Sequence, residues 1–267
     1  LLSFFSNCGT KVLGVDPSSV AKTAMEKGVP IINNFFNESV AKEILSNNGK
    51  AKVITATNVF AHVKELDSFM KGIKLLLEND GVFVSESQYL KHILEKLEYD
   101  TIYHEHLRYY GLKQLVKLFE MYEMELFDAE IINSQGGSIR AYASLKGKYH
   151  VSDSVNKILK DEEEENLHSL ETWKKFAEKV SENKETLLSL LLELKSQNKK
   201  IVGISAPGRS TTVLNYCNIT SEILDYVTEK SNLKIGKYTP GTHIEVVDDE
   251  KLIEEQPDYG LLLSWHL

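Results

Sequence analysis

The stretch KVLGVDPSS, residues 11–19, decides the fold class. It is a short β-rich run that ends in Asp16 and passes into a turn with helix-capping serines. The next residues, AKTAMEKG (21–28), predict a helix that is closed by Gly28. A strand, an acid at its end, a turn and a helix together predict one unit of an α/β fold.

The same alternation continues along the chain. AKVITATNVFAHV (51–63) opens as a second buried strand, and LDSFMKGIKLLLENDG (66–81) has the apolar spacing of a helix that ends in a turn. GVFVSES (81–87) follows as a third strand. Alternating strands and helices predict a parallel sheet with helices on both faces.

The pattern then changes. LKQLVKLFEMYEM (112–124) predicts an amphipathic helix. ELFDAEIINSQGGSIRAYASLKG (125–147) predicts two strands joined around Gly136 and Gly137, which form an antiparallel hairpin at the edge of the sheet. A long helical region, 152 to about 198, separates this part from the C-terminal residues.

A second, smaller α/β unit is predicted over about 199–267. KKIVGISAPGRSTTVLNYCNI (199–219) repeats the pattern of strand, glycine-bearing loop and helix, and LDYVTEK, THIEVVDD and DYGLLLSWHL continue it. The last strand has no covering helix after it, and the first residues lack an initiator methionine and a signal-peptide core. We therefore expect both ends to be truncated.

Composition limits the partners. The formal net charge is −8, and an acidic chain has no general affinity for phosphate backbones, so we expect no nucleic-acid partner. No apolar run approaches the roughly 20 residues that cross a bilayer, so we expect no membrane partner. Cys8 and Cys217 lie far apart without a CxxC pattern, which suits a reducing compartment and a cytoplasmic protein. Nothing in the sequence predicts the oligomeric state.

Polar side chains at the ends of the predicted strands are candidates for a ligand site. In nucleotide-binding α/β folds an acid at the end of the second strand binds ribose hydroxyls, and Asp16 has such a position. Asp16 could equally cap the following helix. Asn58 and His62 lie where the next parallel strand should end, although a histidine in an apolar segment is more often a hydrogen-bonded core residue.

The segment YDTIYHEHLRYYGL (99–112) gathers two histidines around a glutamate. A zinc site would use His104 and His106 but needs a third protein ligand, and no HxxxH or CxxC partner is visible, so we predict no metal here. As an acid–base site, it would use a histidine that changes charge near neutrality, with Glu105 to orient the ring and Tyr103 to donate to an oxyanion. A polar loop that satisfies local backbone groups is the third interpretation.

Four stretches support a more specific prediction. They are FVSESQYLKHILEKLEYDTIYHEHLRYYGL (83–112), INSQGGSIRAYASL (132–145), VGISAPGRSTTVLNYCNI (202–219), and YTPGTHIEVV with PDYGLLLSWHL (238–247 and 257–267). In this order they closely resemble the S-adenosylmethionine-dependent C-methyltransferases of deoxysugar biosynthesis, which act on nucleotide-linked 4-keto sugars. The resemblance covers almost the whole chain.

The resemblance implies a domain organisation. Residues 1–150 would be a partial Rossmann-like methyltransferase domain, and residues 151–267 a helical connector with a C-terminal α/β domain that binds the nucleotide sugar. The implied cofactor is S-adenosyl-L-methionine. Zinc is expected only in an N-terminal domain upstream of Leu1, where the glycine-rich cofactor loop is also expected.

The resemblance also implies catalytic roles. His106 becomes the base that removes the proton at C3 of a 4-keto sugar, and C3 then attacks the sulfonium methyl group. Tyr103 and Glu105 become its partners in the sugar site. His104 becomes a structural residue.

Binding residues are implied in the same way. Asp16 becomes the ribose ligand, and Asn58 and His62 line the junction of cofactor and sugar. The candidates for nucleotide-sugar contacts in the last domain are Gly208, Arg209, Thr211, Asn215 and His243. Arg209 beside a helix N-terminus suits a phosphate contact, and its alternative role is that of a solvated loop residue.

Three other functions remain open. A dehydrogenase would also use an acid after a strand, but it predicts an upstream G-x-G-x-x-G and leaves the two histidines without a task. A sugar O-methyltransferase would differ only in the atom that is methylated. A non-catalytic nucleotide-sugar-binding remnant would keep the sugar pocket without the cofactor.

Overall fold

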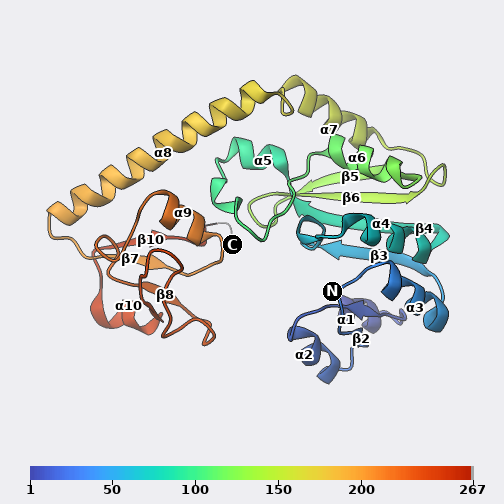
Figure 1. The fold of residues 1–267 in the computed structure, drawn as a ribbon, viewed down its shortest axis with the longest axis horizontal. Coiled ribbons are helices and arrows are strands. Elements are labelled where there is room, and N and C mark those ends of the chain that lie inside the picture. The colour runs from blue at the N-terminus through green and yellow to red at the C-terminus, as the bar shows by residue number, and fades with distance from the viewer. Residues whose placement is uncertain (266–267) are drawn as a thin grey trace. The chain divides into compact units, whose positions relative to one another are not determined.

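A computed structural model describes residues 1–265 of the chain, so His266 and Leu267, at the end of the last predicted strand segment, lie outside the described residues. The chain divides into two compact units that alternate along the sequence (Figure 1). The first unit comprises Leu1–Glu86, Lys113–Glu130 and Arg140–Asn156, and the second comprises Ser87–Leu112, Ile131–Ile139 and the residues from Lys157 onward. Both contain parallel strands and helices, which confirms the predicted α/β class.

The strands of the first unit form two sheets among the described residues. β1 (Gly14–Val15) and β2 (Ile31–Ile32) pair in parallel. The larger sheet has the order β3-β4-β6-β5, in which β3 and β4 are parallel and β5 is an edge. Its strands are β3 (Ala51–Thr57), β4 (Leu77–Gln88), β5 (Met124–Ile132) and β6 (Ser138–Leu145). The predicted hairpin around the glycine pair therefore lies at the predicted edge of the sheet.

The helices of the first unit include one in each of the predicted ranges 21–28, 66–81 and 112–124. They are α1 (Leu2–Asn7), α2 (Val20–Glu26), α3 (Glu38–Asn48), α4 (Leu66–Leu76) and α6 (Leu112–Met121), and a 3-10 helix, η1, spans Phe60–His62. On α4 the apolar side chains buried three and four residues apart are Phe69, Met70, Ile73 and Leu76. This periodicity places one face of α4 in the core of the unit.

β4 begins earlier than the sequence predicts. The expected turn over LENDG is part of the strand, which starts at Leu77 instead of Gly81. Leu77 is fully buried and pairs with Ala51, and the register shifts between Ala51 and Val53. Burial of Leu77 and pairing with β3 thus override the turn preference of the asparagine, aspartate and glycine.

The sheet of the second unit has the order β10-β7-β8-β9, and each neighbouring pair is parallel. Its strands are β7 (Ile201–Ile204), β8 (Val227–Glu229), β9 (Val246–Asp248) and β10 (Tyr259–Leu262). The helices α9 (Ser210–Tyr216) and α10 (Glu250–Glu255) follow β7 and β9. The predicted repeat of strand, loop and helix is confirmed.

The predicted long helical region consists of two helices, α7 (Asp153–Glu164) and α8 (Leu170–Ser196). Ser169 begins α8, and its hydroxyl accepts a hydrogen bond from the Thr172 amide at 3.1 Å. Figure 1 shows α8 as the long helix that leads to the C-terminal strands. The core beneath it includes Cys217, whose fully buried thiol lies 3.6 Å from the Tyr99 hydroxyl. Burial raises the pKa of that thiol.

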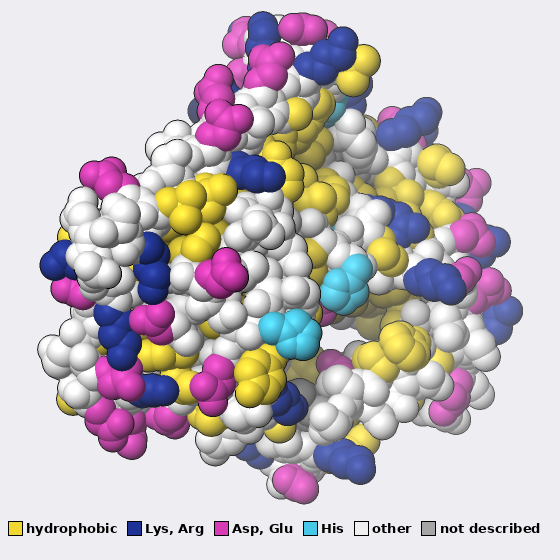
Figure 2. Space-filling view, turned by 60° about the vertical axis from the view of Figure 1, so that its left-hand side comes forward, with side chains coloured by type: hydrophobic (Ala, Val, Ile, Leu, Met, Phe, Trp, Pro, Cys, Tyr) yellow, Lys and Arg dark blue, Asp and Glu magenta, His cyan; other side chains and the backbone are white. Residues whose placement is uncertain are grey.

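The compact units group α5 (Leu90–Glu95) and the 3-10 helix η2 (Tyr99–Thr101) with the C-terminal strands. The expected domain boundary at residue 150 was drawn from sequence motifs and stays a prediction. Within residues 1–265, no helix combines the length and apolar character needed to cross a membrane. Figure 2 shows acidic and basic side chains interspersed over the face that it presents.

Candidate active site

The candidate catalytic segment lies at the carboxyl ends of the C-terminal strands, within the second unit. Arg209, in the loop after β7, places its Nη2 2.7 Å from Oδ1 of Asp100. Trp265, which follows β10, donates from Nε1 to Oδ2 of the same carboxylate at 3.0 Å. Parallel α/β sheets bind ligands outside the carboxyl ends of their strands. The η2 segment therefore packs where such a sheet is expected to hold a ligand.

One more hydrogen bond joins this segment to α9, and the Tyr103 ring lies beside Gly208. The Thr212 hydroxyl donates to the Ile102 carbonyl at 3.3 Å. A Cβ added at Gly208 would lie 3.7 Å from the Tyr103 ring, which is ordinary van der Waals contact. The structure thus brings together Tyr103, Gly208 and Arg209, which the sequence assigned to the sugar and nucleotide-sugar sites.

His106 is half-buried, and its Nδ1 faces two atoms of Thr101. Its Nδ1 lies 2.7 Å from the Thr101 carbonyl oxygen and 2.9 Å from Thr101 Oγ1. Because a carbonyl oxygen only accepts, Nδ1 carries the proton in this arrangement. Nε2 is then the nitrogen with the lone pair, so the ring has the tautomer that a base requires.

Tyr103 and Glu105 form a pair beside this imidazole. The Tyr103 hydroxyl donates to Oε2 of Glu105 at 2.7 Å, and its ring centre lies 4.8 Å from that of His106. Burial, with the hydrogen bond to Glu105 as a second cause, raises the pKa of Tyr103, so the phenol keeps its proton near neutrality. His104 is exposed and meets the Tyr103 ring edge-on at 5.7 Å.

Arg209 is not a solvated loop residue, and that interpretation is wrong. Its side chain is 6% exposed, lies 3.8 Å from Glu98 in addition to its contact with Asp100, and stands 5.2 Å from the Trp265 ring centre. The guanidinium charge is therefore paired with buried carboxylates inside the fold. The expected contact of Arg209 with a substrate phosphate stays a prediction.

The other candidate substrate residues form a neighbouring group. Asn215 donates from Nδ2 to the Thr211 carbonyl at 2.8 Å and to the Pro240 carbonyl at 3.0 Å. These bonds tie α9 to the loop before β9. His243 lies in that loop with a φ of 53°, is exposed, and has its ring centre 6.3 Å from that of Tyr238. Their contact with a substrate stays a prediction.

Asp16 directly follows β1, but it does not cap a helix. Its Oδ1 accepts from the Ser18 amide at 2.8 Å and from the Ser18 hydroxyl at 2.5 Å. Ser19 occupies the N-cap of α2 with helical backbone angles and makes no side-chain capping bond, so the expected serine cap is wrong at this residue. Both bonds to Asp16 use Oδ1, which leaves acceptor capacity on Oδ2 for a hydroxyl.

Asn58 and His62 lie just beyond the carboxyl end of β3, where the sequence placed them. Asn58 is exposed, has a φ of 53°, and donates its amide to the Glu86 carbonyl at 2.8 Å. His62 is half-buried at the end of η1, so it is not a fully buried core residue. Their role at the cofactor stays a prediction.

Sequence reasoning missed the buried polar residues behind His106. Glu98 is fully buried, accepts from Nε2 of Gln88 at 2.5 Å, and has its pKa raised by burial. The Thr101 hydroxyl donates to Oε1 of the same glutamine. Two acids on either side of an aromatic residue, in LEYDT, are the sequence signal that could have revealed this group.

Gly136, in the hairpin connection, is required by this group. Its φ is 91°, and a Cβ there would lie 2.6 Å from Oε1 of Glu98. Only glycine leaves room for the buried carboxylate at this approach. The glycine pair that marks the hairpin therefore also shapes the site.

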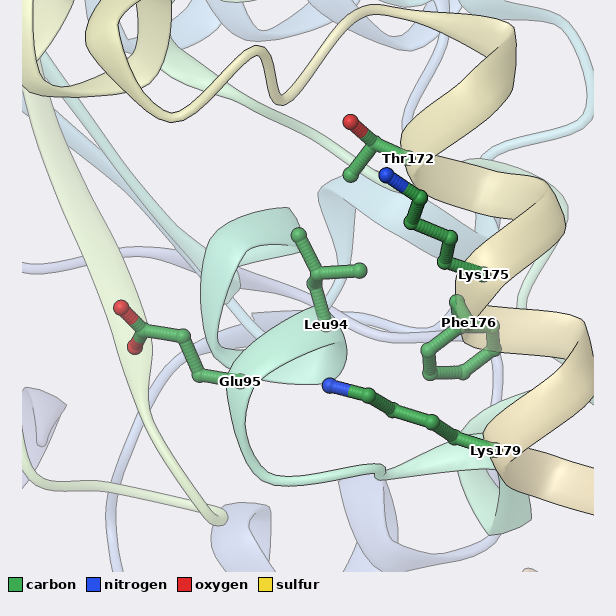
Figure 3. Close-up of a pocket in the computed structure, with 6 residues that line it drawn as sticks. All are labelled: Leu94, Glu95, Thr172, Lys175, Phe176 and Lys179. Carbon is green, nitrogen blue, oxygen red and sulfur yellow. The ribbon is translucent and has the colours of Figure 1, made fainter. Parts of the chain in front are cut away.

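No metal centre is visible in the described part of the chain, because no three His, Cys, Asp or Glu side chains within residues 1–265 are grouped to hold an ion. A pocket of about 280 Å³ lies between α5 and α8 (Figure 3). Its lining residues are Leu94, Glu95, Thr172, Lys175, Phe176 and Lys179, which include none of the predicted site residues.

Comparison with known proteins relates both halves of the chain to methyltransferases. A model described as the C-methyltransferase C-terminal domain matches residues 133–267, and one described as a methyltransferase domain matches residues 1–127. The C-methyltransferase NovU of Streptomyces niveus is 30% identical over 267 residues. The match covers 99% of this chain and 64% of NovU, so the chain spans less than two thirds of that relative.

Solved structures give weaker matches. An S-adenosylmethionine-dependent methyltransferase of Anabaena variabilis has a TM-score of 0.42 at 16% identity and covers 54% of this chain and 72% of its own. The magnesium protoporphyrin IX methyltransferase of Synechocystis, solved with bound SAH, has a TM-score of 0.39 at 12% identity, with coverages of 51% and 65%. The relationship therefore rests on the sequence matches.

Proposed function

We propose, on the basis that this chain belongs to the S-adenosylmethionine-dependent C-methyltransferase family, that it transfers a methyl group to a sugar carbon. The proposed substrate is a nucleotide-linked 4-keto-deoxysugar, and the proposed position is C3, next to the ketone. The cytoplasm is the proposed compartment, because both cysteines are free thiols and suit a reducing environment.

The imidazole of His106 carries this proposal. Its Nδ1 donates to the Thr101 carbonyl at 2.7 Å, so Nε2 has the lone pair that accepts a proton. The hydrogen next to a ketone is weakly acidic because the carbanion is delocalised onto the oxygen. A histidine that titrates near neutral pH is a suitable base for such a carbon acid.

In the proposed reaction Nε2 of His106 removes the C3 proton and holds it. The electron pair of the broken C–H bond is delocalised onto the 4-keto oxygen. Tyr103 is a protonated donor, and by turning its hydroxyl from Glu105 it can donate to that oxygen. S-adenosylmethionine, when bound, supplies a methyl group on a positively charged sulfur, which the carbanion accepts as the carbon–sulfur bond breaks.

Two features of the first unit fit S-adenosylmethionine. Asp16 follows a parallel strand and engages Ser18 through Oδ1, so Oδ2 can accept from a ribose hydroxyl. Asn58 is exposed in the turn after β3, at the edge where parallel sheets bind nucleosides. These residues would bind the nucleoside part and take no part in proton transfer.

The test is His106→Asn in the full-length protein. Turnover should fall by about 10²- to 10⁴-fold, which is the range for loss of a general base. S-adenosylmethionine binding, measured by calorimetry, should be unchanged. His104→Asn is the matched control, because that ring is exposed in the same segment, and it should keep the wild-type rate.

A second measurement isolates the proton transfer. With the demethylated cofactor in place of the donor, the wild type should exchange the C3 hydrogen with deuterium from solvent, and His106→Asn should not. A near-normal rate in the variant would contradict the proposal. An O–CH3 product would instead identify a sugar O-methyltransferase, and nucleotide-sugar binding without S-adenosylmethionine binding would identify a non-catalytic remnant.

A further inference from the structure

We propose that a buried polar network fixes the tautomer and the position of His106, an inference that rests on the role proposed for this residue above. The members of this Thr101 network are Gln88, Glu98, Asp100, Thr101 and Arg209. Gln88, Glu98, Asp100 and Thr101 are positioning residues, because they act on the reaction only through the imidazole. Arg209 supports them through its ion pair with Asp100.

Two atoms of Thr101 face the ring of His106. Thr101 is fully buried, and its carbonyl oxygen and Oγ1 lie 2.7 Å and 2.9 Å from Nδ1 of His106. The hydroxyl proton is donated to Oε1 of Gln88, so Oγ1 faces the imidazole as an acceptor. Two acceptors at Nδ1 favour the tautomer in which Nδ1 is protonated and Nε2 is basic.

The side-chain amide of Gln88 is fixed in one of its two orientations. Its Oε1 accepts from Thr101, and its Nε2 donates to Oε2 of Glu98 at 2.5 Å. A reversed amide would place its NH₂ against the Thr101 hydroxyl and its oxygen against a carboxylate. The fully buried Glu98 therefore selects the amide orientation that keeps Oγ1 of Thr101 an acceptor.

Arg209 links the network to the C-terminal sheet. Arg209 comes from the loop after β7 and is 6% exposed. Its guanidinium lies 2.7 Å from Asp100 and 3.8 Å from Glu98. Asp100 directly precedes Thr101, so this ion pair anchors the residue next to the one whose carbonyl receives Nδ1–H. Orientation of the base is thus tied to the loop that also carries Gly208.

The network is tested by the tautomer of His106, read from its imidazole ¹⁵N shifts in the full-length protein. The His106 signals are identified by their loss in His106→Gln. In the wild type Nδ1 should be protonated. Thr101→Val keeps the side-chain shape and removes Oγ1, and it should lower the ratio of the Nδ1–H to the Nε2–H form about fivefold, the effect of one typical hydrogen bond.

Two further variants test whether the change in the tautomer ratio is due to the Thr101 hydroxyl. Thr101→Ser restores the hydroxyl and should restore the ratio. Thr212→Val removes a hydroxyl that contacts the adjacent Ile102 carbonyl outside the network, and it should leave the ratio unchanged. In methyl transfer, Thr101→Val should lower kcat by a similar factor with KM unchanged, because the Thr101 side chain is fully buried and acts on the imidazole alone.

If Thr101→Val does not fold, Gln88→Leu tests the same claim from the half-buried end of the network and should shift the ratio in the same direction. An Nε2–H tautomer in the wild type, or a Thr101→Val ratio equal to that of Thr212→Val, would overturn the inference. The spectra are recorded without substrate or donor. A protein that fails to methylate but shows these shifts therefore refutes the proposed function alone.

Discussion

Two loops of the molecule each follow a parallel strand, and they differ in how far along the chain the partners of their charged residues lie. The loop after β1 carries Asp16, whose carboxylate binds Ser18, two residues further on. The loop after β7 carries Arg209, whose guanidinium binds Asp100, 109 positions away in the sequence. Both residues follow a parallel strand, and both were predicted to contact a ligand.

This difference determines which of the two charged side chains is free to bind a ligand. An exposed local hydrogen bond exchanges readily with water or with a hydroxyl. A buried ion pair is different, because removing one partner leaves an uncompensated charge in the interior. We therefore expect Asp16 to act in binding, and Arg209 to act first in holding the second unit together.

The largest expected effect is that of Arg209→Met on stability. The variant leaves Glu98 and Asp100 buried without their guanidinium, so the free energy of unfolding should fall by about 3–5 kcal/mol. Urea unfolding measures this loss. Lys230→Met, an exposed cation in the same unit, is the control and should stay within about 0.5 kcal/mol. A loss below about 1 kcal/mol for Arg209→Met would contradict the structural role of the Arg209 ion pair and so the difference proposed between the two loops.

Asp16→Asn should have an intermediate effect, on binding. A hydrogen bond to a charged group contributes about 1.5–3 kcal/mol, so S-adenosylmethionine should bind about 10- to 100-fold more weakly in calorimetry. Stability should change by no more than about 1 kcal/mol, since the bonds to Ser18 are exposed. Ser18→Ala is the control, and it should alter the turn without a comparable loss of affinity. Equal affinities for Asp16→Asn and the wild type would remove the ribose assignment.

The smallest effect is expected from Glu98→Gln and appears as a pH dependence. Burial raises the pKa of Glu98 in the folded protein above its ordinary value of 4.5, although Gln88, Arg209 and Lys96 offset part of this shift. The folded state therefore favours the protonated acid. Its contribution to stability is full below pH 4.5 and is lost as the pH rises through the raised pKa.

Glu98→Gln cannot ionise, so its unfolding free energy should decline less than that of the wild type as the pH increases above 4.5. Urea unfolding at a series of pH values measures the two slopes. Superimposable slopes would mean that the carboxylate is compensated as fully as the exposed one at Asp16.

Much of the fold was predictable because the elements follow local patterns. The apolar spacing of α4 and the β-rich runs of β3 and β7 are each contained within a few consecutive residues. The early start of β4 was not predictable, because Leu77 joins the strand only through its pairing with Ala51.

The candidate site likewise contains residues that the sequence predicts and contacts that it does not. The histidine-rich segment stands out by composition, and the resemblance of its motifs selects His106 over His104. Neither source reveals Thr101 as the partner of Nδ1, because that contact depends on the turn that returns the chain from Thr101 to His106. The ion pair between Arg209 and Asp100 depends on two distant segments meeting in space, which no local pattern encodes.

The burial of Cys217 has a practical consequence for experiments on both loops. Its thiol is enclosed against Tyr99, and its raised pKa keeps it protonated, so alkylating reagents will reach it only when the surrounding helices open. Cys8 is exposed at the other end of the chain. Within these 267 residues, a maleimide dye will thus label the native fold at Cys8 first, and late modification of Cys217 will report on unfolding of the C-terminal core.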